Sequence, residues 1–110
     1  MGSGSKGPKE SVESRELETL RSRIDELDVR IVRLLNRRAR LGLQAGHVKT
    51  LNGRPVADAE REREVLVRVA MANDGPLPQE VMLALYRQLI ETIKRLEELK
   101  SSEQDGGSHG

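Results

Sequence analysis

The sequence has no cysteine, tryptophan or phenylalanine, and its one aromatic residue is Tyr86. Without cysteine there can be no disulfide, no thiolate metal site and no cysteine nucleophile. A single aromatic side chain argues against a module that stacks nucleic-acid bases. Only two histidines occur, and His109 lies at the extreme C-terminus, so a metal site built from several histidines is hard to assemble. We therefore expect neither nucleic-acid binding nor a metal centre.

Strong charge of one sign and long apolar runs are also missing. The 110 residues carry 19 basic and 18 acidic side chains, a formal net charge of +1, which does not indicate a polyanion-binding chain. No run of 18 apolar residues and no apolar N-terminal leader occurs, so we expect a cytoplasmic protein without a membrane span. Any chemistry must come from Arg, Lys, Asp, Glu, Gln and hydroxyl groups.

The composition divides the chain into one domain and two tails. Residues 1–14 and 101–110 are rich in glycine, serine and charge and lack apolar periodicity, which predicts disordered tails. Residues 15–100 have the length of a single domain.

Apolar spacings of three and four predict an all-α domain with three helices. The first helix is expected over residues 15–50 and ends before Asn52-Gly53 and Arg54-Pro55. The second begins near Asp58, a good N-cap residue, and ends at residues 73–76. The third spans about residues 78–100.

The first predicted helix is too long for a compact single chain. Its 36 residues would extend roughly 54 Å, whereas a globule of about 85 residues is only roughly 25 Å across. An apolar stripe follows most of this length, and the two shorter helices cannot cover it. We therefore predict a homodimer in which the long helices pack along each other.

A cation interrupts the apolar stripe of the long helix at Arg38. Lys49 lies almost three turns later on nearly the same face, and Gly42, Ala45 and Gly46 lie between them. Each glycine inside a helix costs about 1 kcal/mol relative to alanine, so something must offset that cost. The pattern fits a cavity with a small-residue floor and a cation at each end. It also fits a close helix contact with both cations reaching into solvent, which the pattern alone favours.

Two acidic features also allow two interpretations. Asp58, Arg61 and Glu62 share one face of the second helix, either as a cap with solvated ion pairs or as a ligand-binding set. Glu97 occupies an otherwise apolar stripe of the third helix. It is either a solvated residue at the helix end or a buried acid with a raised pKa.

Taken together, these residues resemble the all-helical (AroQ) class of chorismate mutases. The resemblance covers about residues 17–98. The segments that carry it are TLRSRIDELD (19–28), LLNRRARL (34–41), AGHVK (45–49), RPVADAEREREVL (54–66), NDGPLP (73–78) and LYRQLIETIKRLEE (85–98).

The resemblance implies an intertwined homodimer and a role for each of these residues. Arg21 would be donated to the partner's site, and Arg38 would bind a substrate carboxylate. Lys49 and Glu97 would contact the ether oxygen of the substrate. The substrate's hydroxyl group would lie near three further residues, Asp58, Arg61 and Glu62.

The implied reaction is the rearrangement of chorismate to prephenate in phenylalanine and tyrosine biosynthesis, which uses no cofactor. Two positions depart from the family pattern. Ile93 stands where some members have serine, which removes one polar contact, and His47 replaces a lysine that is not expected to touch substrate.

Two other functions remain open at this stage. Isochorismate-pyruvate lyases share this fold and much of the site, although the intact D-x-x-R-E sequence and the linker over residues 50–57 favour the mutase. The other alternative is a weakly active, regulatory mutase-like domain that partners another shikimate-pathway enzyme.

Overall fold

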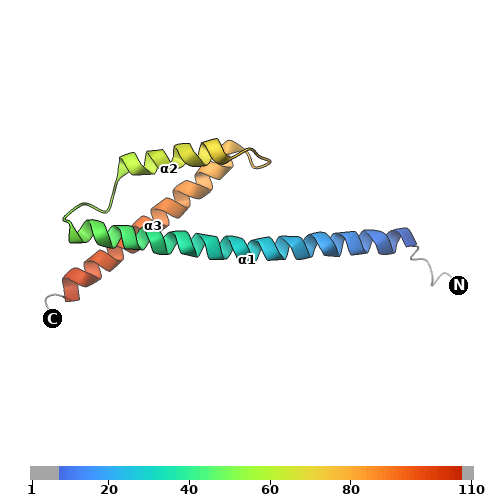
Figure 1. The fold of residues 1–110 in the computed structure, drawn as a ribbon, viewed down its shortest axis with the longest axis horizontal. Coiled ribbons are helices and arrows are strands. Elements are labelled where there is room, and N and C mark those ends of the chain that lie inside the picture. The colour runs from blue at the N-terminus through green and yellow to red at the C-terminus, as the bar shows by residue number, and fades with distance from the viewer. Residues whose placement is uncertain (1–7, 108–110) are drawn as a thin grey trace. The chain divides into compact units, whose positions relative to one another are not determined.

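The computed structural model describes residues 8–107 and the side chains of residues 11–103. Within that range the chain forms three α-helices, α1 (Pro8–Leu51), α2 (Ala59–Ala72) and α3 (Gln79–Gly107), and no strand (Figure 1). The predicted all-α fold with one very long helix is confirmed. Among the described residues, no helix combines the length and apolar character needed to cross a membrane.

The first and third helices extend further than the apolar periodicity predicts. Helix α1 begins at Pro8 rather than near Arg15, and α3 continues beyond Lys100 to Gly107. Proline is well tolerated at the first helical position, and neither proline nor glycine occurs from residue 9 to residue 41. Helix α1 therefore begins several residues before its apolar stripe, which starts at Leu17. Residues 1–7 and 108–110 of the predicted tails lie outside the described residues.

The chain divides into two units, residues 1–37 and 38–110, with the boundary inside α1. In the first unit, residues 8–37 form a single helix, and among the described residues of that unit no other element covers it. Its apolar stripe is about half exposed at every position, namely Leu17, Leu20, Ile24, Leu27, Ile31 and Leu34.

The second unit contains the end of α1, all of α2 and all of α3, and α2 packs against α3. Its most buried apolar side chain is Ile93, which is 4% exposed. A Cβ atom added at Gly42 would lie 2.8 Å from Cγ2 of Ile93. The glycine therefore lets α3 approach the end of α1 at a distance that alanine would prevent.

The two predicted turns are present. Gly53 and Gly75 both have positive φ angles, 68° and 83°, which glycine adopts without steric cost. The side chain of Asn73 donates to the Leu77 carbonyl at 3.1 Å and to Oε1 of Gln79 at 2.9 Å. Gln79 in turn donates to the Ala70 carbonyl at 2.8 Å. These bonds tie the end of α2 to the start of α3.

Candidate functional site

A cavity of about 340 Å³ lies within residues 38–97, a size in the range of small-molecule sites. The end of α1, the segment before α2, α2 itself and α3 all contribute to it. Its lining comprises Arg38, Leu41, Gly42, Ala45, Lys49, Val56, Asp58, Arg61, Glu62, Val65, Ile90, Ile93, Lys94 and Glu97.

The cavity brings together six of the seven residues singled out from the sequence. These are Arg38, Lys49, Asp58, Arg61, Glu62 and Glu97. The seventh, Arg21, belongs to the first unit of the chain, where its side chain is 62% exposed and pairs with Glu18 at 3.5 Å across one turn. Of the predicted floor of small residues, Gly42 and Ala45 line the cavity, whereas Gly46 does not.

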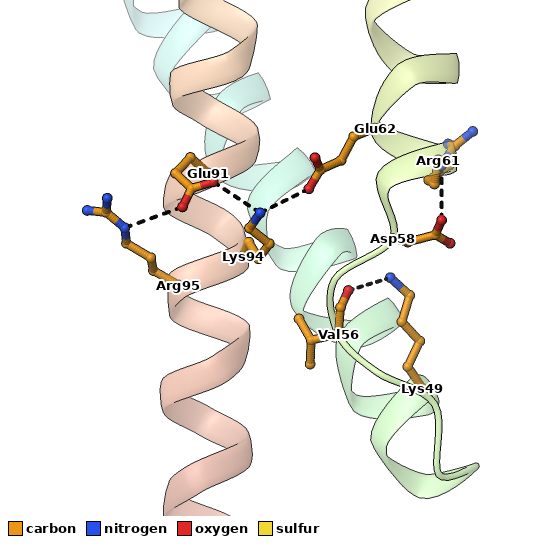
Figure 2. Close-up of polar contacts among 8 residues, drawn as sticks. All are labelled: Lys49, Val56, Asp58, Arg61, Glu62, Glu91, Lys94 and Arg95. Carbon is orange, nitrogen blue, oxygen red and sulfur yellow. Dashed lines mark hydrogen bonds and ion pairs between the residues drawn. The ribbon is translucent and has the colours of Figure 1, made fainter.

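The two cavity cations that α1 contributes, Arg38 and Lys49, each contact a neighbour. The guanidinium of Arg38 lies 5.8 Å from the centre of the Tyr86 ring, within the range of a cation–π contact. The ammonium of Lys49 donates to the carbonyl of Val56 at 3.2 Å, as Figure 2 shows. Both side chains are half-buried and line the cavity. The close helix contact predicted over the small residues is also present at Gly42, and neither cation lies fully in solvent.

Asp58 acts as the N-cap of α2. Its Oδ1 accepts a hydrogen bond from the backbone N–H of Arg61 at 3.0 Å, which satisfies a donor that the first turn cannot pair. The Arg61 guanidinium pairs with Glu64 at 3.3 Å in an exposed position. Both the cap interpretation and the cavity interpretation therefore apply, because Asp58 and Arg61 also line the cavity.

Glu97 is half-buried against the end of α1. A Cβ atom added at Gly46 would lie 2.8 Å from both Cγ and Oε2 of Glu97, so the glycine leaves the space that the carboxyl group occupies. Burial raises the pKa of Glu97, the neighbouring charge of Lys49 partly opposes that shift, and Glu98 adds to it. Glu97 thus lies between the two predicted extremes, because its side chain is half-buried and burial raises its pKa.

The charges around the cavity suit a small anion. Four cations line it, Arg38, Lys49, Arg61 and Lys94, together with three acids, Asp58, Glu62 and Glu97. When Glu97 is protonated, the lining has an excess of two positive charges. The arrangement can therefore hold a dianion while keeping one neutral acid available as a hydrogen-bond donor.

Sequence reasoning missed Lys94, which lines the cavity from α3. Its ammonium lies 3.3 Å from Oε1 of Glu62 and 3.1 Å from Oε2 of Glu91. Lys94 stands in a charged segment that reads as a solvated face, so the sequence offers little signal for it. Of the two positions that depart from the family pattern in the sequence, Ile93 lines the cavity and His47 does not.

The sequence matches a known protein family over most of its length. The family model described as "Chorismate mutase type II" matches residues 20–98. That range includes all seven residues singled out above.

Curated relatives and solved structures agree with this match. The chain is similar to a bifunctional chorismate mutase/prephenate dehydratase of Aquifex aeolicus, with 38% identity over 74% of this chain and 24% of the relative. It thus spans about a quarter of that longer protein. It is also similar to a chorismate mutase of Methanocaldococcus jannaschii, with 28% identity over 74% of this chain and 83% of the relative. The structure of a chorismate mutase from Thermus thermophilus aligns with a TM-score of 0.72 and 34% identity, covering 76% of this chain and 94% of that one.

Proposed function

The chain belongs to the chorismate mutase type II family, and we propose that it catalyses the rearrangement of chorismate to prephenate. The observation that carries the proposal is the cavity lined by Arg38, Lys49 and the half-buried acid Glu97. This combination supplies positive charge for a dianion and a neutral hydrogen-bond donor.

The reaction is a unimolecular pericyclic step in which one C–O bond breaks as one C–C bond forms. No covalent intermediate is involved, so catalysis depends on two tasks. The site must hold a flexible dianion in its compact, reactive conformer, and it must stabilise the negative charge that grows on the ether oxygen.

Arginine suits the first task because its planar guanidinium can bind a carboxylate through two hydrogen bonds. We assign one substrate carboxylate to Arg38. The Tyr86 ring beneath its guanidinium, at 5.8 Å, limits the directions in which Arg38 can point.

Lys49 and Glu97 suit the second task. Lys49 is already anchored by the Val56 carbonyl and has further N–H donors available to an oxygen of the substrate. A carboxylate cannot donate a hydrogen bond, so Glu97 must be protonated to assist the ether oxygen. Burial favours the protonated form, in agreement with this role.

The hydroxyl group of the substrate is assigned to the start of α2, where Asp58 and Glu62 line the cavity. Carboxylates are hydrogen-bond acceptors, and Asp58 and Glu62 can each accept from a hydroxyl group. Arg61 lies between them on the same face and limits the repulsion between these acids and the substrate.

The working unit that we propose is a homodimer whose sites each receive Arg21 from the partner. The long apolar stripe of residues 17–34 supports this, because it is half exposed and nothing in the described part of its own unit covers it. A second copy would remove that surface from water and place Arg21, which lies on the same helix, beside a foreign cavity.

The longer curated relatives suggest a wider setting. Their names pair a chorismate mutase with a prephenate dehydratase, so we propose that the product is passed to another enzyme of the shikimate pathway. The predicted compartment for this pathway step is the cytoplasm.

Incubation of the purified chain with chorismate tests the proposal, with products identified by chromatography. We expect prephenate. A parallel incubation with isochorismate should yield no salicylate or pyruvate, and their formation in place of prephenate would instead identify a lyase. If neither substrate is consumed, the proposed activity is wrong.

A further inference from the structure

We propose that Lys94 is a positioning residue that fixes the carboxylate of Glu62 for the substrate's hydroxyl group. This inference rests on the proposed function. Lys94 has no role in the assignments made from the sequence, yet it lines the same cavity as Arg38, Lys49 and Glu97.

The contacts of Lys94 connect two helices. Its ammonium on α3 lies 3.3 Å from Oε1 of Glu62 on α2 and 3.1 Å from Oε2 of Glu91 on its own helix. Figure 2 shows the Lys94 ammonium between the two carboxylates. By contrast, the pairs Arg61–Glu64 and Arg95–Glu91 each lie within one helix and constrain nothing across the cavity.

Partial burial strengthens the ion pair between Lys94 and Glu62. The Lys94 side chain is only 25% exposed and that of Glu62 only 33%, so water screens this pair less than a surface ion pair. Glutamate has several rotatable bonds, and an anchored Oε1 restricts where its other carboxylate oxygen can lie. An acceptor held in place before substrate binds need not be ordered during the reaction.

The positive charge of Lys94 also offsets the negative charge of the Glu62 carboxylate. The substrate is a dianion, and an unpaired carboxylate at Glu62 would repel it. The hydrogen bond to Glu91, followed by that to Glu62, raises the pKa of Lys94, so this side chain stays charged at neutral pH. A cationic Lys94 therefore offsets the charge of Glu62 without removing its ability to accept a hydrogen bond.

Steady-state kinetics of Lys94→Met on chorismate, with circular dichroism melting of each variant, test the proposal. We expect kcat/KM to fall about tenfold, since neighbouring charged groups commonly couple to this extent. Lys94→Arg, which keeps the charge and can reach Glu62, should recover most of the loss. Arg95→Met is the matched control, because Arg95 pairs with the same Glu91 but is 73% exposed and does not line the cavity. Its kcat/KM should stay near that of the wild type.

A double-mutant cycle separates positioning from a purely structural role. If Lys94 acts through Glu62, Lys94→Met should change kcat/KM by less than about twofold in the Glu62→Gln background. An equal tenfold loss in both backgrounds, or no loss in the wild-type background, would overturn the proposal. If Lys94→Met does not fold, Lys94→Gln carries the same test. An inactive wild-type chain would count against the proposed function itself, so the two failures are distinguishable.

Discussion

Replacement of Gly46 by alanine tests whether the end of α1 places the carboxyl group of Glu97. The new Cβ atom would lie 2.8 Å from Cγ and Oε2 of Glu97. Carbon atoms in ordinary contact are about 3.5 Å apart, so the Glu97 side chain would have to move by about 0.7 Å. A misplacement of about 1 Å at a reacting centre can cost about 100-fold in rate. We therefore expect kcat/KM to fall on the order of tenfold.

Stability should respond differently from activity. Alanine in place of glycine inside a helix contributes about 1 kcal/mol of stability. The displaced Glu97 side chain is flexible and can move at small cost, which offsets part of this gain. We therefore expect the free energy of unfolding to rise by less than about 1 kcal/mol, while the rate of chorismate turnover falls.

Thermal melting and chorismate kinetics on the same preparations measure both quantities. The control repeats Gly46→Ala in a Glu97→Ala background, where no carboxyl group remains to be displaced and the rate should change by less than about twofold. Wild-type kcat/KM in the single variant would refute the idea that Gly46 keeps space for Glu97. An equal loss in the two backgrounds would refute it as well.

Four further predictions concern the site and the proposed dimer. Because burial raises the pKa of Glu97 and only its protonated form donates, kcat should fall as pH rises through that pKa, and Glu97→Gln should flatten the pH–rate profile. The buried acid stabilises the fold less once it ionises, so the melting temperature of Glu97→Gln relative to the wild type should increase as pH rises. Arg21→Ala and Arg38→Ala chains, each inactive alone, should regain about a quarter of wild-type activity after unfolding and refolding together, because half of the dimers would be mixed with one intact site each. No recovery in a mixture shown to exchange subunits would contradict a shared site. Asp58→Ala should lower the free energy of unfolding by about 1 kcal/mol through the lost cap, whereas Asp58→Asn, which still caps, should leave it nearly unchanged in chemical denaturation.

The three helices and their turns were predictable because they depend on local signals. Spacings of three and four defined the apolar faces, and Asn52-Gly53 and the 73–76 segment marked the breaks, where Gly53 and Gly75 take positive φ angles. The helix ends were less predictable. Apolar periodicity marks one face of a helix, and α1 continues to Pro8, N-terminal to Leu17, where the predicted stripe begins.

The candidate site was predictable where a residue departs from its helical pattern. Arg38 and Glu97 both stand out as charges on apolar stripes, and both line the cavity. Lys94 does not stand out, because its role depends on which face α2 presents to α3, and spacing along one helix carries no information about that. Arg21 remains a prediction, since its proposed site belongs to a second copy of the chain.

The rate of prephenate formation from chorismate, compared between the wild type and Lys49→Ala at equal concentrations of folded protein, tests the central claim most directly. Lys49 lines the cavity and contacts Val56 through a single hydrogen bond, so its replacement should leave the fold in place. We predict turnover by the wild type and loss of about 100-fold or more in kcat/KM for the variant, in line with the removal of a charge-stabilising donor. Similar kcat/KM values for the two proteins would contradict the claim that this cavity is the site of the reaction.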